Sequence, residues 1–341
     1  MASLLHLHES LLPREPLRKF RRERPLNDFV FSDNPPFLSH FPIPLTLNPK
    51  TKAIFVLGSS GTGKSKLAIS LAHRFDGEVI NSDKMQVYDG LPIITNKVTA
   101  QECAGVPHHL LGGVHPDADF TASEFSGLAV AAMEDIVARG RLPIIAGGSN
   151  SYIKELVGVD NGRRFECCFI WVDVDPPVLD EFVAERVDKM VEQGLVEEAR
   201  GVFDPEADYT RGVRRSIGLP EMDLYFRWEE RVDEAGRGAM LAIAFDAIKD
   251  NTCRLTRVQR EKIRRFEEVD GWRLHRVDAT PAMMRRNRAT GERVWEDTVV
   301  VPCIETTRRF IEGPGFLSRC GGAVAGGDGA GAVPAILGAM K

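Results

Sequence analysis

The sequence predicts an α/β protein in which helices cover both faces of a parallel sheet, followed by a C-terminal helical subdomain. Short continuous apolar runs alternate with segments of helical periodicity up to residue 175, as in strands buried on both faces. Beyond that residue the pattern is mostly helical. With 341 residues, 43% of them hydrophobic, the chain can build one large or two modest domains.

The two ends of the chain differ in composition from the middle. Residues 1–50 are rich in arginine and proline, and we expect either a disordered transit peptide or a simple disordered extension. Residues 313–341 are dominated by Gly and Ala and are also expected to be disordered. The predicted folded parts are therefore an α/β core over 51–175 and a helical subdomain over 176–312. The chain has no apolar run long enough for a membrane span and no CxxC spacing for a zinc module.

The individual elements follow from local patterns. A helix is expected over 63–75, and a second begins at the capping box Thr121-x-x-Glu124 and stops at Gly140. Two prolines and an apolar stripe predict a helix from 176 to Gly194, and a long helix is expected near 241–266. The apolar runs predict buried strands over 53–58, 78–81, 142–146 and 167–174.

The clearest motif lies between the first strand and the first helix. The residues Gly58, Ser59, Ser60, Gly61, Thr62, Gly63, Lys64 and Ser65 match GxxxxGK[ST] in its required strand–loop–helix context. Backbone N–H groups and the helix N-terminus favour phosphate, Lys64 supplies a positive charge, and Ser65 can ligate Mg²⁺. The motif predicts a P-loop NTPase-like core that binds a polyphosphate, without saying which one.

A second group of polar residues follows the second strand. Asp83 lies just past the carboxyl end of that strand, where open α/β sheets present catalytic side chains. A carboxylate there can accept a proton from a nucleophile, and Gln86 can read a donor–acceptor edge such as a nucleobase. The alternative is an aspartate that only caps a loop.

Several segments, in order, resemble plant adenylate isopentenyltransferases, the cytokinin-synthesising relatives of the tRNA isopentenyltransferases. The resemblance extends over roughly residues 53–311. The segments that carry it include NSDKMQVY (81–88), GLPIITNK (90–97), VPHHLLG (106–112) and GGSNSYI (147–153).

The resemblance implies a reaction and roles for the motif residues. The loop would hold the diphosphate of dimethylallyl diphosphate with Mg²⁺ as cofactor, and the dimethylallyl group would pass to the N6 amino group of ADP or ATP (or AMP). Diphosphate would leave, in the first step of cytokinin biosynthesis. Asp83 would be the general base, Lys64 would stabilise the leaving group, and Ser60 keeps the hydroxyl where relatives often carry Thr.

Further residues of the resembling segments have two interpretations each. Lys97 would lie near the substrate phosphates or be a solvated loop lysine, and Ser149 would line the substrate channel or only cap a helix. Arg214 or Arg215 would bind phosphate rather than belong to a charged helix face. The adjacent His108 and His109 are expected to pack and hydrogen-bond rather than to bind metal.

Two other functions remain as alternatives: a tRNA adenine isopentenyltransferase and a P-loop kinase or NTPase. The formal net charge is −5; since residues 1–50 carry seven basic and five acidic residues (+2), residues 51–341 carry −7. An acidic folded part argues against tRNA. We therefore expect no tRNA partner, no membrane and a monomer. The expected location is the plastid, with cytoplasm or mitochondrion as alternatives.

Overall fold

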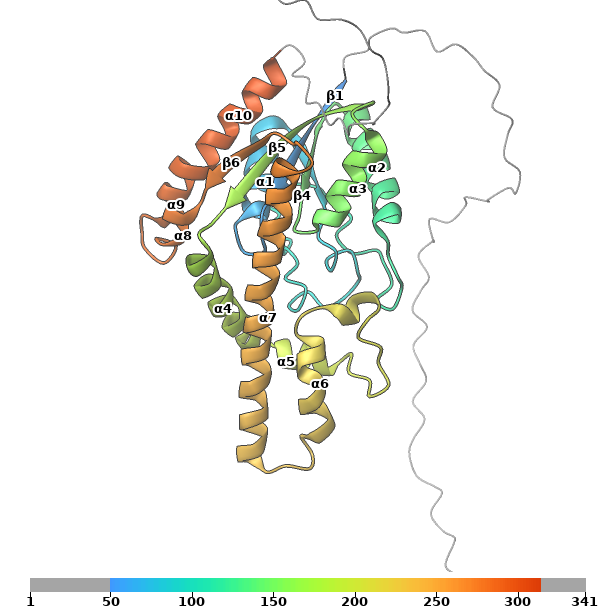
Figure 1. The fold of residues 1–341 in the computed structure, drawn as a ribbon, viewed down its shortest axis with the longest axis vertical. Coiled ribbons are helices and arrows are strands. Elements are labelled where there is room, and N and C mark those ends of the chain that lie inside the picture. The colour runs from blue at the N-terminus through green and yellow to red at the C-terminus, as the bar shows by residue number, and fades with distance from the viewer. Residues whose placement is uncertain (1–49, 314–341) are drawn as a thin grey trace, which may run out of the picture. The chain divides into compact units, whose positions relative to one another are not determined.

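The computed structural model describes residues 50–313, which contain a six-stranded, fully parallel sheet (Figure 1). The strand order is β3-β2-β4-β1-β5-β6. The predicted leader and tail lie outside the described residues except for positions 50 and 313. The strands are β1 Thr51–Leu57, β2 Gly77–Asn81, β3 His108–His109, β4 Leu142–Ala146, β5 Phe165–Asp173 and β6 Leu274–Asp278.

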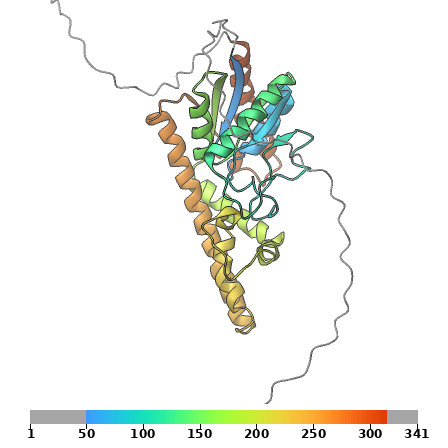
Figure 2. The ribbon, with the colours of Figure 1, turned by 90° about the vertical axis from the view of Figure 1, so that its right-hand side faces the viewer.

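The helices confirm the predicted covering of both faces of the sheet (Figures 1 and 2). Phe55 of β1 belongs to a core cluster with α2 and α3, whereas its neighbours Ile54 and Val56 pack with α1 and the C-terminal helices. This alternation along one central strand requires apolar layers on both sides, which explains the continuous apolar runs. The elements concerned are α1 Lys64–Phe75, α2 Ala122–Ala138, α3 Asn150–Asp160, α9 Gly291–Trp295, the π-helix η2 Glu296–Val300 and α10 Val301–Glu312.

The predicted start of α2 is confirmed in detail. The hydroxyl of Thr121 accepts a hydrogen bond from the Glu124 N–H at 3.1 Å, and the Glu124 carboxylate accepts one from the Thr121 N–H at 2.8 Å. The box thus satisfies two backbone donors that the first turn would leave unpaired.

The region after β5 is mainly helical, as predicted, with one correction. Its helices are α4 Pro176–Glu192, α5 Leu195–Arg200, η1 Gly212–Arg215, α6 Leu219–Trp228, α7 Glu234–Glu268 and α8 Thr280–Met283. The predicted helical subdomain of 176–312 also contains a strand that was not predicted, β6, which pairs with β5 at the sheet edge. The sequence of β6, Leu-His-Arg-Val-Asp, lacks the apolar run of a buried strand because much of this edge strand faces solvent. None of the described helices is both long and apolar enough to cross a membrane.

The long helix α7 positions the site because it crosses the carboxyl edge of the sheet (Figure 2). The guanidinium of Arg260, on this helix, donates two hydrogen bonds of 2.9 Å to the buried carboxylate of Asp173, the last residue of β5. A bidentate pair of this kind holds the helix in one orientation as well as contributing energy. The side chains of α7 near Arg260 are therefore fixed against the loops that follow the strands.

Candidate active site

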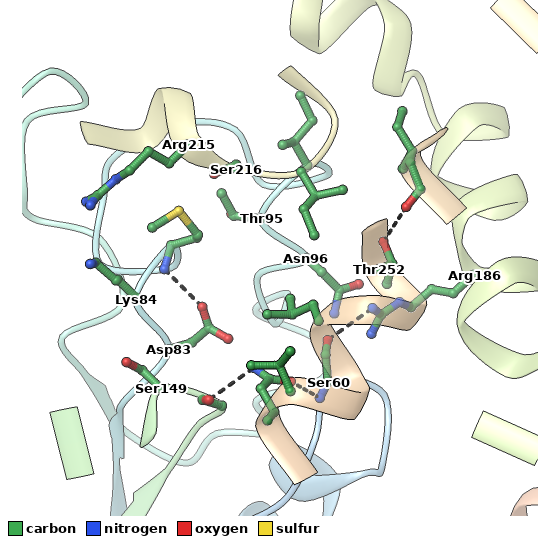
Figure 3. Close-up of a pocket in the computed structure, with 18 of the residues that line it drawn as sticks. Ser60, Asp83, Lys84, Thr95, Asn96, Ser149, Arg186, Arg215, Ser216 and Thr252 are labelled. Carbon is green, nitrogen blue, oxygen red and sulfur yellow. Dashed lines mark hydrogen bonds between the residues drawn. The ribbon is translucent and has the colours of Figure 1, made fainter. Parts of the chain in front are cut away.

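A cavity of about 400 Å³ opens at the carboxyl edge of the sheet (Figure 3). This is the place where open α/β sheets bind ligands, and the volume lies in the range of small-molecule sites. Polar side chains from separate parts of the chain line it, among them Ser60 after β1, Asp83 after β2, Ser149 after β4, Arg186 of α4, Arg215 of η1 and Gln259 of α7.

The phosphate loop that begins at Gly58 is tightly folded against later parts of the chain. The Lys64 ammonium donates to the Ser59 carbonyl at 2.6 Å, and the Thr62 hydroxyl donates to the same carbonyl at 3.0 Å. Gly63 has a φ of +91°, and a Cβ there would lie 2.4 Å from the ring of Trp295. Only glycine satisfies both conditions, so α9 and the loop fit together at this position.

Two cations, the buried Lys64 and the half-buried Arg186, lie beside the loop. Burial lowers the pKa of Lys64 to about 8; Asp83 opposes this shift and Arg186 adds to it. Burial also lowers the pKa of Arg186, which donates from Nη2 to the Ser60 hydroxyl at 3.1 Å. Its Nε has no hydrogen-bond partner within residues 50–313. Two charges removed from water with so few partners make this a strongly anion-attracting place.

Asp83 combines both interpretations that its position allows. Its Oδ1 accepts a hydrogen bond from the Met85 N–H at 3.0 Å, and its own N–H donates to Asn81 Oδ1 at 3.1 Å, so the side chain does organise a turn. The half-buried carboxylate also lines the cavity, where Figure 3 shows it on the opposite side from Arg186. A carboxylate held in one orientation at a cavity wall can accept a proton from a bound group.

Two other predicted residues also reach the cavity. Ser149 lines it, and its hydroxyl makes no capping hydrogen bond to α3, so the capping alternative is wrong for this side chain. Arg215 lines the cavity and donates to the Tyr88 hydroxyl at 3.4 Å.

Outside the phosphate loop, three predicted binding residues do not line the cavity. Gln86 donates to the carbonyls of Thr95 and Asn96 and so holds those cavity residues in place. Lys97 donates to the Tyr88 and Gly90 carbonyls, and its ammonium braces a loop instead of facing the cavity.

The third of these is Arg214, which is bound to Asp117 at 3.2 Å and to the Val202 carbonyl at 2.7 Å. The sequence could not separate Arg214 from its neighbour Arg215, because only the fold of η1 decides which guanidinium turns inward.

Of the predicted phosphate-loop residues only Ser60 lines the cavity, and Lys64 and the other loop residues lie behind it. Gly61 lies against Val183 of α4, and the Ser59 hydroxyl donates to the Thr256 carbonyl of α7 at 2.8 Å. Ser65 is exposed in the first turn of α1 and makes no hydrogen bond through its hydroxyl within residues 50–313. Its oxygen is thus accessible to a cation.

The two histidines make hydrogen bonds, as predicted. His108 is bonded to the Val106 carbonyl at 2.9 Å and His109 to Glu78 at 2.6 Å. No group of three or more His, Cys, Asp or Glu side chains that could hold a metal occurs in the part of the chain that the structure describes.

Sequence reasoning missed several cavity residues, among them Arg186 and Gln259. Arg186 occupies a position beside Val183, Val187 and Met190, which form the buried stripe of α4. A cationic residue next to the apolar stripe of a helix was the feature of the sequence that could have indicated a cavity residue. Gln259 carried no signal, since a glutamine on a charged helix is ordinarily solvated.

Comparison of the sequence with known proteins identifies the family of this chain. A family model described as IPP transferase matches residues 86–163 and 158–266. The chain belongs to the IPP transferase family. It is 52% identical over 267 residues to adenylate isopentenyltransferase 5, chloroplastic, of Arabidopsis thaliana, covering 77% of this chain and 81% of that protein. It is 50% identical to the mitochondrial adenylate isopentenyltransferase 7 of the same plant, covering 77% and 82%.

Solved structures extend the likeness to the fold. A eukaryotic dimethylallyltransferase acting on tRNA superposes with a TM-score of 0.64 at 25% identity, covering 76% of this chain and 79% of that one. The tRNA isopentenylpyrophosphate transferase of Bacillus halodurans gives 0.58 at 24% identity, covering 76% and 99%, and supports the fold alone. The IPP transferase family membership confirms the resemblance that the motifs indicated.

Proposed function

We propose that this protein transfers the dimethylallyl group of dimethylallyl diphosphate to the N6 amino group of ADP or ATP, the first step of cytokinin biosynthesis. The observation that carries the proposal is the shared cavity, which is lined by the Asp83 carboxylate, by the half-buried guanidinium of Arg186 across from it and by Ser60 of the phosphate loop. A base for the acceptor and an anion site for the leaving group thus face the same cavity. The names of the similar plant proteins support the same reaction.

On the donor side, Lys64, Arg186 and Ser60 bind the diphosphate and stabilise the charge that it gains on leaving. Mg²⁺, a hard cation that prefers oxygen ligands, fits the exposed Ser65 hydroxyl together with diphosphate oxygens. When bound, Mg²⁺ neutralises developing negative charge on the leaving group. The apolar cavity residues Val187, Met190 and Ile248 suit the five-carbon chain of the donor.

On the acceptor side, Asp83 orients the amino group and receives its proton. The bond between the allylic carbon and the diphosphate oxygen breaks, a bond between that carbon and N6 forms, and one N6 proton passes to the carboxylate. The N6 lone pair is delocalised into the adenine ring, so this general base is worth about 10²–10⁴-fold in rate.

The cavity mouth favours an acceptor with several phosphates. Burial lowers the pKa of Lys84, and repulsion by Arg215 and Lys262 acts in the same direction, so three cations lie near one another. A neighbouring pocket of about 270 Å³ shares Lys262 and adds Arg265, together with Lys154, whose ammonium is paired with Asp270. We therefore propose ADP or ATP rather than AMP as the preferred acceptor, because more phosphates meet more of these cations.

The test is a panel of acceptors with dimethylallyl diphosphate and Mg²⁺: AMP, ADP, ATP and a tRNA stem-loop, with products separated by chromatography. We expect prenylated ADP and ATP, and no product when Mg²⁺ is chelated. Asp83→Asn should abolish transfer, while Asp135→Asn on the exposed face of α2 should not. Prenylation of tRNA alone, or ATP hydrolysis alone, would contradict the proposal.

We also propose a plastid location and a monomeric state. The names of the two Arabidopsis relatives give a chloroplast and a mitochondrion. A fluorescent protein fused to residues 1–50 distinguishes plastid from mitochondrion and cytoplasm, and light scattering of the full chain gives its mass.

A further inference from the structure

The side-chain amide of Gln259 connects two loops of the cavity, the phosphate loop after β1 and the loop after β4. Its Oε1 accepts a hydrogen bond from the Ser60 N–H at 2.8 Å, in the phosphate loop after β1. Its Nε2 donates to the Gly148 carbonyl at 3.0 Å, in the loop after β4. Both ends of the planar amide are used, so the distance between the two loops is set by the size of one rigid group.

The glutamine is itself held firmly. It is 8% exposed, and its backbone carbonyl accepts a hydrogen bond from Asn150 Nδ2 at 3.0 Å. One residue further along α7, Arg260 is bound to Asp173, and one turn earlier the Thr256 carbonyl accepts from Ser59. The helix that carries the amide is thus fixed to the sheet through Arg260 and to the phosphate loop through Thr256.

Gly148 brings the acceptor base close to the same amide. A Cβ on Gly148 would lie 2.6 Å from Gln259 Nε2 and 3.6 Å from Asp83 Oδ2. The absence of a side chain lets the carboxylate and the glutamine amide approach one stretch of backbone from two directions. Ser60 therefore marks the donor side of the amide, and Gly148 with Asp83 marks the acceptor side.

We propose that Gln259 is a positioning residue that sets the spacing between the donor diphosphate and the acceptor amine. This inference rests on the proposed function. The glutamine acts through Ser60 and Gly148 and touches neither reacting atom. In-line displacement tolerates little misplacement, and about 1 Å can cost about 10²-fold in rate.

A second nucleophile makes the proposal measurable. In transfer, the allylic carbon–oxygen bond breaks and the carbon bonds to N6, which loses a proton to Asp83. If N6 is out of line, water can attack the same carbon and lose a proton, which yields dimethylallyl alcohol. Both routes release one diphosphate, so the ratio of prenylated nucleotide to diphosphate reports the alignment of N6.

The experiment compares Gln259→Met and Gln259→Glu with the wild type and with Gln101→Met, an exposed loop control. The methionine loses both hydrogen bonds at similar size, and the glutamate keeps an acceptor for Ser60 but cannot donate to Gly148. We expect the kcat of transfer to fall about 10–100-fold in the methionine variant and less in the glutamate variant. The alcohol should take a larger share of the diphosphate released in both, and the control should behave as wild type.

A merely structural role would lower the melting temperature and the rate without changing the ratio of nucleotide product to diphosphate, and that result overturns the inference. If the methionine variant does not fold, the polar glutamate variant of equal size carries the test. If the wild type transfers the dimethylallyl group and the variants show the same ratio of prenylated nucleotide to diphosphate, only this inference is contradicted. A wild-type chain that prenylates no nucleotide contradicts the proposed function itself.

Discussion

The buried carboxylate of Glu78 provides a quantitative test of how the sheet edge is stabilised. Glu78 is 2% exposed in β2 and accepts hydrogen bonds of 3.1 and 2.7 Å from Arg139, one of 3.1 Å from Arg141 and one of 2.6 Å with His109. These partners come from the end of α2, the approach to β4 and β3. Glu78→Gln keeps the shape of the side chain and removes its charge.

The hydrogen bonds from Arg139, assisted by those from His109 and Arg141, lower the pKa of Glu78 from 4.5 to about 2 against the effect of burial. A shift of that size corresponds to about 3 kcal/mol of stabilisation by the charged form. The side chains of Arg139 and Arg141 are 46% and 38% exposed, so solvent screening reduces the expected loss to about 2 kcal/mol. For a domain of this size we expect the melting temperature to fall by about 4–8 °C.

The sign of the pH dependence follows from the lowered pKa. Because the carboxyl group ionises more readily in the folded state, its stabilisation is complete above pH 4.5 and is lost as the pH falls toward 2. Urea unfolding of wild type and variant should therefore differ fully at pH 7, and the difference should shrink by about 1 kcal/mol near pH 3.5–4.

The matched control is Glu134→Gln, which removes an ion pair whose two side chains are 47% and 53% exposed and should cost under about 0.5 kcal/mol. Our reasoning would be refuted if Glu78→Gln cost no more than this control at pH 7. A difference between Glu78→Gln and wild type that stays constant down to pH 3.5 would refute it equally.

Three further predictions concern the phosphate loop and its neighbours. Arg186→Met should raise the KM for dimethylallyl diphosphate about 10–100-fold, since a charge-assisted hydrogen bond is worth about 1.5–3 kcal/mol, and steady-state kinetics should show the nucleotide KM unchanged. Lys64 is charged below its pKa of about 8, so kcat/KM for the donor should fall as the pH rises through 8; Lys64→Arg should move that fall to higher pH, and an unmoved profile would exclude Lys64 as its cause. Gly63→Ala should lose activity and thermal stability because its methyl group meets the ring of Trp295, whereas Gly238→Ala, in open space on α7, should lose neither.

Local features of the sequence predicted most of the architecture. The phosphate loop, the capping box of α2 and the apolar runs of the four buried strands each consist of neighbouring residues, and the structure has all of them. The edge strands β3 and β6 were missed. β3 has only two residues, and most side chains of β6 are exposed to solvent, so neither strand shows an apolar run. The same locality explains why Gln86, Lys97 and Arg214 were assigned to the cavity: they lie beside cavity residues in the chain, but their side chains turn away.

The sequence by itself determined the fold class, the phosphate loop, the position of Asp83 and the likeness to the plant enzymes, since contiguous residues carry each of these. Only the tertiary structure decided which distant side chains complete the site. Arg186 and Gln259 lie more than a hundred residues beyond Ser60, and they meet it only because α4 and α7 pack across the carboxyl edge of the sheet. Neither helix reveals from its own periodicity which polar residue will be buried, because that depends on the loop it covers.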